Sequence, residues 1–120
     1  MKQHGDRFSA LCERARADIR EIDAATLLTR LEGAGAPVVV DVREDHEWAA
    51  GRIPGAVHVG RGILERDVEA TWPDLATELV LYCGGGYRSA LAAKSLQDMG
   101  YTNVASLAGG QRGWQTNKLP

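Results

Sequence analysis

The segment from Leu81 to Ser89 contains the residue types that could do chemistry, because it reads Leu-Tyr-Cys-Gly-Gly-Gly-Tyr-Arg-Ser. Glycines let the backbone N–H groups of a turn point inward, since they adopt conformations that a Cβ would forbid. Arg88 adds a full positive charge to the same space. Such surroundings favour an anion and lower the pKa of a thiol from about 8.5 to roughly 3.5–7.5. The segment therefore predicts that Cys83 is a thiolate nucleophile at neutral pH.

The flanking residues indicate how Cys83 is positioned. Residues 78–82 form a short, bounded apolar run, which predicts a buried strand. Residues 89–99 are rich in helix formers and are followed by Gly100, which predicts a helix with a glycine after its end. Cys83 would thus stand where a strand ends and a helix begins, and the positive end of that helix would add to the anion-binding character of the turn.

The segment has three other possible interpretations. A cysteine closing an apolar strand is often a small buried hydrophobe beside a flexible turn, but this leaves Arg88 unexplained. A dinucleotide fingerprint would need a third glycine, where Ser89 stands, and an acidic residue further on, whereas none follows Asp98. A Walker A loop would end in Gly-Lys-Ser or Gly-Lys-Thr, which is absent.

Composition sets broad limits on the fold and on the partners. With 120 residues, 44% of them hydrophobic, the chain can form one compact domain. The net charge is −2, with basic and acidic residues interspersed, and no apolar run approaches the ~20 residues that span a bilayer. We therefore expect no nucleic-acid partner and no membrane contact. The polar start and the two cysteines, which lack Cys-x-x-Cys spacing, favour a cytoplasmic protein.

The rest of the chain predicts two parts, an N-terminal amphipathic helix within residues 1–21 that packs on the domain, and a single domain over residues 22–120. Cys12 falls on the apolar face of the first helix, so a core position is expected, with a role as a resolving thiol for Cys83 as the alternative. Asp23 is the expected N-cap of the next helix, with Ile22 and Leu27 as a hydrophobic staple.

Strands and helices then alternate along the chain. The expected elements are a helix ending near Gly33, a strand over 37–42, a helical turn over 45–50, a strand over 56–59, a helical segment over 62–71 and a strand over 104–107, before a terminal loop and helical turn over 109–115. This order predicts an α/β fold with a mostly parallel sheet and helices on both faces. Ligands of such sheets bind beyond the carboxyl ends of the strands, where Cys83 is expected.

Three motifs, taken together, resemble the rhodanese family of single-domain sulfurtransferases. They match from about Ile22 to Trp114, and it is their order that makes the resemblance specific. The motifs are Asp41-Val42-Arg43-Glu44 with Glu47-Trp48 and Gly51-Arg52-Ile53-Pro54-Gly55-Ala56-Val57-His58, then Cys83-Gly84-Gly85-Gly86-Tyr87-Arg88-Ser89, then Leu107-x-Gly109-Gly110-x-x-Gly113-Trp114.

The resemblance implies a rhodanese-like fold and an enzyme that needs no cofactor. Cys83 would take a sulfane sulfur from thiosulfate or another persulfide and pass it to a thiol or cyanide, with a sulfur-relay protein as a further partner. The backbone of the loop would stabilise the anionic persulfide, and Arg88 would attract an anionic donor. The expected substrate-binding residues are Gly84, Gly85, Gly86, Tyr87 and Arg88.

The resemblance leaves alternatives open. A phosphatase or arsenate reductase is one alternative, because related dual-specificity phosphatases also use a loop cysteine and arginine. Their loops have five residues between the two, whereas four stand between Cys83 and Arg88, and a shorter loop closes on a smaller atom, which favours a terminal sulfur over a tetrahedral phosphate. Relatives that use mercaptopyruvate resemble Cys-Gly-Ser-Gly at the loop, where this chain has Gly85 in place of the serine, which favours thiosulfate or a protein persulfide over mercaptopyruvate. A non-enzymatic module that binds a partner or senses oxidants is the alternative from another functional class.

Other residues have structural explanations. Asp41 and Arg43 are expected to tie loops together through charge-assisted hydrogen bonds, and His58 to be a satisfied core group rather than a general base. Glu65 is assigned either to the pocket mouth or to the solvated face of a helix. Trp72 and Trp114 are expected to pack in the core. No grouping of His, Cys, Asp and Glu has metal-ligand spacing, so no metal is expected.

Overall fold

The computed structural model describes residues 4–120 and consists of alternating helices and short strands. In chain order the elements are α1 (Asp6–Asp18), β1 (Arg20–Ile22), α2 (Ala24–Glu32), β2 (Val38–Asp41), α3 (Asp45–Ala50), β3 (Val57–His58), α4 (Leu64–Thr71), β4 (Leu79–Tyr82), α5 (Tyr87–Asp98), β5 (Val104–Leu107) and α6 (Gly110–Thr116). No helix in this part of the chain is long and apolar enough to cross a bilayer.

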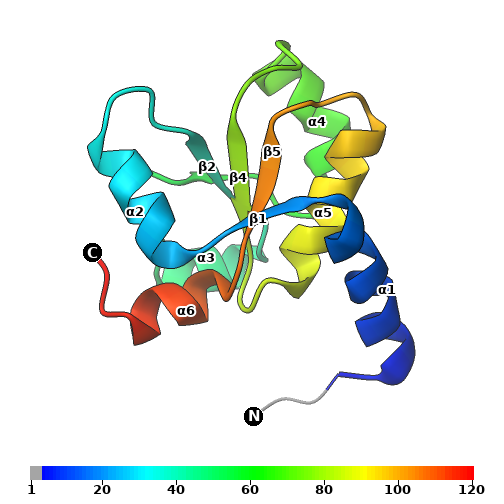
Figure 1. The fold of residues 1–120 in the computed structure, drawn as a ribbon, viewed down its shortest axis with the longest axis horizontal. Helices are drawn as coiled ribbons and strands as arrows, with labels where there is room; N and C mark the ends of the chain where they lie inside the picture. The colour runs from blue at the N-terminus through cyan, green and yellow to red at the C-terminus, as the bar shows by residue number, and fades with distance from the viewer. Residues whose placement is uncertain (1–3) are drawn as a thin grey trace.

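The five strands form one parallel sheet in the order β1-β5-β4-β2-β3. In Figure 1, α2 and α6 cover one face of the sheet, and α4 and α5 cover the other. The α/β architecture predicted from the alternating elements is confirmed. Strand β1 was not predicted, because two of its three residues, Arg20 and Glu21, are charged and the segment has no apolar run.

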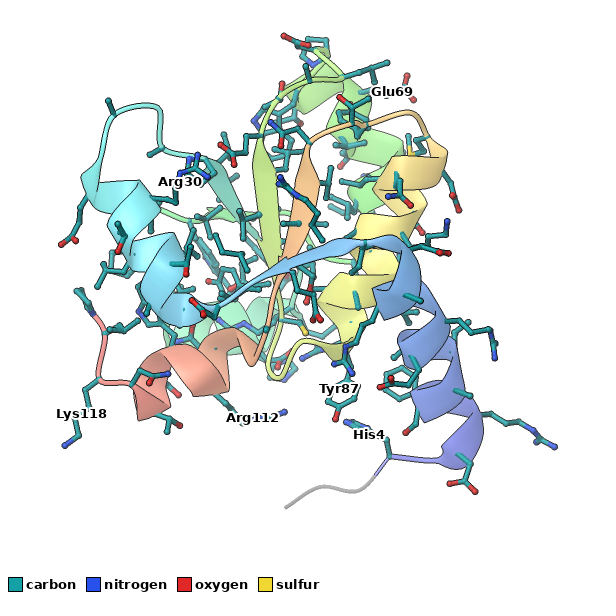
Figure 2. The ribbon with its side chains drawn as sticks, in the orientation of Figure 1. His4, Arg30, Glu69, Tyr87, Arg112 and Lys118 are labelled. Atoms are coloured by element: carbon teal, nitrogen blue, oxygen red, sulfur yellow. The ribbon has the colours of Figure 1, made fainter. Side chains whose placement is uncertain are left out.

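Helix α1 lies outside α5 and brings the start of the described chain to the end of the sheet where Cys83 lies. Figure 2 shows His4 beside Tyr87, the first residue of α5. The ring centroid of Tyr87 is 4.4 Å from that of His4 and 6.1 Å from that of Phe8. Cys12 and Ala15 are buried on the inner face of α1. The boundary expected after residue 21 falls inside β1, so residues of the N-terminal segment also extend the sheet.

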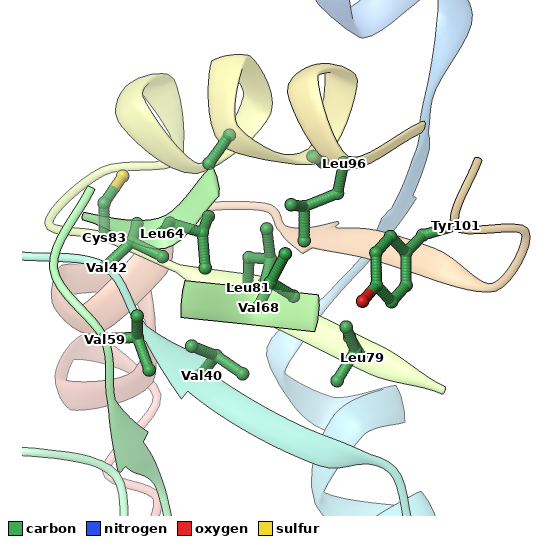
Figure 3. Packing of buried hydrophobic residues seen from close by; sticks show 12 residues of the cluster. Val40, Val42, Val59, Leu64, Val68, Leu79, Leu81, Cys83, Leu96 and Tyr101 are labelled. Carbon is green, nitrogen blue, oxygen red and sulfur yellow. The ribbon is translucent and has the colours of Figure 1, made fainter. Parts of the chain in front are cut away.

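Side chains from the strands alternate between two hydrophobic clusters, as the period of two in a strand requires. One cluster lies under α4 and α5 and includes Val40, Leu79 and Leu81 (Figure 3). The other lies under α2 and α6 and includes residues from all three central strands together with Trp114. Every residue of β4 is buried, as expected for a central strand. Figure 3 shows Cys83 at one end of the first cluster.

Local signals account for where α2 and α5 begin. The Asp23 carboxylate accepts a hydrogen bond from the Thr26 N–H at 2.8 Å, which confirms the predicted N-cap. Helix α5 begins at Tyr87, two residues before the expected start at Ser89. Gly86 precedes it with φ of +96°, a conformation that favours glycine and lets the helix begin immediately after the turn. Tyr87 and Arg88 therefore belong to the first turn of α5 rather than to a free loop.

Candidate active site

The segment after β4 is clamped by the start of α6. The Cys83 carbonyl oxygen accepts a hydrogen bond from the Gln111 N–H at 2.8 Å, and the Gly84 carbonyl oxygen accepts one from the Arg112 N–H at 3.0 Å. Gly110 makes this close approach possible, because a Cβ at that position would overlap the backbone of Cys83 and Gly84. These contacts fix the position of Cys83, which directly follows β4.

The Cys83 sulfur faces hydrogen-bond donors at the start of α5. The N–H groups of Gly86 and Ser89 donate to Sγ at 3.1 and 3.4 Å, and Ser89 Oγ lies 3.5 Å from Sγ. Ser89 Oγ is in turn 2.8 Å from Ser106 Oγ on β5, and both serines are fully buried. N–H groups at a helix N-terminus lack partners within the helix, so they are free to bind an anion.

These donors set the ionisation of Cys83. Burial acts to raise the pKa of this thiol, but hydrogen bonds from the Ser89 hydroxyl and from the N–H groups of Ser89, Gly85 and Gly86 outweigh it. The pKa of Cys83 consequently lies below its usual value. The shift has the direction expected from the sequence, and Ser89 contributes to it in addition to the residues predicted from the sequence.

Arg88 is not a free charge, because Glu47 of α3 pairs with it. The two Glu47 carboxylate oxygens accept hydrogen bonds from the two terminal nitrogens of Arg88 at 2.8 and 3.0 Å. This pairing lowers the pKa of Glu47 to about 2 and raises that of Arg88. Arg88 alone predicts a positive site, but Glu47, which is distant in sequence, compensates this charge.

A cavity of about 720 Å³ opens over the loop. Tyr87, Phe8 and His4 supply aromatic surface to it, and Arg112 of α6 supplies a second guanidinium. Figure 2 shows Arg112 on one side of this region and Tyr87 and His4 on the other. The lining residues are His4, Gly5, Phe8, Glu44, His46, Glu47, Cys83, Gly85, Tyr87, Arg88 and Arg112. Of the predicted site residues, Cys83, Gly85, Tyr87 and Arg88 thus line one cavity, and Gly84 and Gly86 belong to the loop below it.

Asp41, Arg43 and His58 support the loops around the site. The Arg43 guanidinium donates to both oxygens of the buried Asp41 carboxylate and to the Gly51 carbonyl oxygen at 2.6 Å. His58 Nε2 lies 2.8 Å from the Arg43 carbonyl oxygen, and its ring stacks on Trp48 with centroids 4.9 Å apart. These contacts agree with the structural roles expected of all three residues.

The remaining candidate residues lie outside the cavity. Glu65 of α4 accepts a hydrogen bond from Arg61 at 2.6 Å and does not line the cavity. Its alternative expected position, at the pocket mouth, is therefore wrong. Trp114 is buried and Trp72 packs against the first hydrophobic cluster, as expected. Cys12 is buried with its Sγ 3.7 Å from the Tyr87 carbonyl oxygen, and burial raises the pKa of its thiol.

Comparison with known proteins identifies the family. The model of the rhodanese-like domain matches residues 23–117. A thiosulfate sulfurtransferase of Stutzerimonas stutzeri is 36% identical over 85 residues, which cover 71% of this chain and 75% of that protein. The human single-domain sulfurtransferase is similar in structure, with a TM-score of 0.73 and 30% identity over 80% of this chain and 95% of that one.

A third likeness is to a protein of unknown function from Rhodopseudomonas palustris, described as a "possible tyrosine phosphatase". Its structure matches with a TM-score of 0.86 and 34% identity, over 100% of this chain and 98% of that one. The family match, the sulfurtransferase relatives and the parallel sheet with its cysteine loop agree with one another. This chain belongs to the rhodanese-like sulfurtransferase family.

Proposed function

We propose that this protein moves a sulfane sulfur from thiosulfate to a thiol or cyanide through a persulfide on Cys83. The observation that carries the proposal is the Cys83 sulfur itself, held by N–H donors at the floor of a cavity with its pKa below the usual value. A thiolate so placed is a nucleophile, and the same donors would stabilise a persulfide anion.

In the first step the Cys83 thiolate attacks the outer sulfur of thiosulfate. A new S–S bond forms on Cys83, the S–S bond of thiosulfate breaks, and sulfite leaves with the bonding electron pair. In the second step an acceptor thiolate or cyanide attacks the outer sulfur of the persulfide, and the Cys83 thiolate leaves. The product is a new persulfide or thiocyanate, and Cys83 returns to its initial state.

Burial of Cys83 explains why an acceptor would react with the transferred outer sulfur rather than with the sulfur of Cys83. Cys83 is 1% exposed, so its own sulfur presents little surface to the cavity. A persulfide places a second sulfur one bond further out, toward the cavity and its entrance. The site would therefore present the transferred sulfur to an acceptor while the Cys83 sulfur stays among its donors.

Loading of Cys83 is tested by intact-protein mass spectrometry after incubation with thiosulfate, followed by addition of cyanide. Wild type and Cys12→Ser should each gain one sulfur atom and lose it to cyanide as thiocyanate, whereas Cys83→Ser should not. Absence of both the adduct and thiocyanate from correctly folded wild type would overturn the assignment of thiosulfate. Persulfide donors tested in parallel would show whether another donor loads Cys83.

Phosphate-ester hydrolysis is the competing reaction, because one structural relative is described as a possible phosphatase. Only four residues separate Cys83 from Arg88, and Gly86 N–H lies within 3.1 Å of Sγ, so the loop closes tightly around the sulfur. Such a loop favours a single sulfur atom over a tetrahedral phosphate. Turnover of an aryl phosphate that depends on Cys83, without sulfur loading, would reverse this assignment.

The acceptor and the compartment are further parts of the proposal. The cavity is large enough to admit a small thiol, and its aromatic wall suits the apolar part of one. A sulfur-relay protein with an accessible cysteine would also supply an acceptor thiol. Both cysteines are free, which fits a reducing compartment such as the cytoplasm.

A further inference from the structure

The charges around Gly84 do not balance. A Cβ built on Gly84 would lie 3.2 Å from an Arg88 nitrogen, 3.8 Å from an Arg112 nitrogen and 4.0 Å from a Glu47 oxygen. Two guanidinium groups and one carboxylate therefore meet at this point. Because Glu47 binds Arg88 through two hydrogen bonds, Arg88 and Glu47 largely cancel as seen from the cavity.

Arg112 has no such partner. Within residues 4–120 its guanidinium forms no ion pair, and the only other carboxylate that lines the cavity, Glu44, caps the backbone of α3. The Arg112 backbone is fixed by its hydrogen bond to the Gly84 carbonyl oxygen at 3.0 Å. The side chain thus begins at a defined point and carries an uncompensated positive charge into the wall of the cavity.

Gly85 provides the space that the Arg112 side chain occupies. A Cβ at position 85 would overlap a terminal nitrogen of Arg112, and the three atoms nearest to that Cβ all belong to the Arg112 guanidinium group. Gly85 has no positive φ, so its backbone conformation does not demand glycine. The missing side chain is therefore needed for the position of Arg112 rather than for the turn.

We propose that Arg112 is the residue that recognises the negative charge of the sulfur donor, and that Gly85 permits this by leaving room for its guanidinium group. The proposal rests on the proposed function and deepens it, because it assigns donor specificity to a residue of α6 outside the cysteine loop. Thiosulfate is a dianion, and its sulfonate end, which becomes the departing sulfite, carries part of the negative charge. Arg112 would attract this end while the outer sulfur approaches Cys83.

The proposal can be tested without any sulfur transfer. Iodoacetate is an anion and iodoacetamide is neutral, and both alkylate a thiolate, so the ratio of their rates at Cys83 reports the local charge and cancels the thiolate fraction. Peptide mapping restricts the measurement to Cys83. We expect Arg112→Gln to lower the iodoacetate-to-iodoacetamide ratio about three- to tenfold, the size expected for one charge acting across partly solvated space. Added salt should shrink the difference.

Matched variants sharpen the test. Arg112→Lys should keep most of the ratio, and Arg66→Gln, which removes a charge from the exposed surface of α4, should leave it unchanged. Gly85→Ser should lower the ratio by displacing Arg112, and adding Arg112→Gln to it should lower the ratio no further. Far-UV circular dichroism tests whether each variant is folded. Arg112→Met is a second variant that removes the charge of Arg112.

The two proposals fail in different ways. A ratio in Arg112→Gln equal to that in Arg66→Gln would overturn the role of Arg112, even if thiosulfate loads Cys83. If wild type fails to load from thiosulfate but the alkylation ratio still depends on Arg112, the assignment of thiosulfate as donor is overturned. Recognition of anions by Arg112 then stands. If both hold, Arg112→Gln should lower kcat/KM for thiosulfate by a similar factor and should affect loading less for a persulfide donor whose organic group is uncharged.

Discussion

Replacing Glu47 by Gln tests whether its ion pair with Arg88 stabilises the fold and neutralises the site. Glutamine keeps an oxygen that can accept the Glu44 N–H, which Glu47 Oε1 accepts at 3.1 Å, so the cap of α3 is retained. The charge is removed, together with one of the two oxygens that accept hydrogen bonds from Arg88. The substitution therefore separates the Glu47–Arg88 contact from the role of Glu47 in the helix.

The size of the effect follows from the pKa of Glu47, which is about 2 in the folded protein against an ordinary value of 4.5. That difference corresponds to at most about 3 kcal/mol. The side chains of Arg88 and Glu47 are 37% and 26% exposed, so solvent screening reduces the expected contribution to about 1–1.5 kcal/mol. Because the folded pKa is the lower one, the stabilisation is complete above the unfolded pKa and is lost as pH falls through about 2.

Urea unfolding monitored by tryptophan fluorescence, at several pH values between 2.5 and 7, measures this contribution in the free energy of unfolding. Wild type should be about 1–1.5 kcal/mol more stable than Glu47→Gln near pH 7, and the gap should narrow as the solution is acidified. Other carboxylates with lowered pKa values, such as Glu78 and Asp23, are common to both proteins and cancel in the comparison. A gap that stays constant with pH would refute the reasoning.

Freeing Arg88 should also raise the iodoacetate-to-iodoacetamide ratio at Cys83 in Glu47→Gln, and an unchanged ratio would show that Arg88 is not masked by Glu47. Ser89→Ala should raise the pKa of Cys83, because the hydroxyl that helps to hold its thiolate is lost. The pH profile of iodoacetamide alkylation should move to higher pH, Ser89→Thr should restore it, and superimposable profiles would contradict the assignment. Gly110→Ala should cost at least about 2 kcal/mol in urea unfolding, because its Cβ would overlap Cys83 and Gly84 and its φ is +55°. Gly60→Ala, where the nearest atom lies 3.6 Å away, is the matched control, and equal stabilities of the two variants would count against the clamp between α6 and the loop.

Much of the fold could be predicted because its signals are local. The buried runs that form β2, β4 and β5 are contiguous in sequence, and their alternation with helices indicates parallel strands. The same local pattern placed Cys83 at a strand end beside a glycine turn. Strand β1 was not predicted because its three residues do not form an apolar run. It exists because these residues pair with the otherwise free edge of β5.

The candidate site divides in the same way. The sequence by itself determined which residues form the candidate loop, with Cys83 as the proposed nucleophile, since Cys83 through Ser89 are contiguous and their spacing is readable. Only the tertiary structure decided the charge of the site, because Glu47 lies 41 residues from Arg88, and Arg112 reaches Gly85 from another helix. Ion pairs and steric contacts depend on distances of a few ångströms between elements, and chain order does not specify these until the sheet brings its carboxyl ends together.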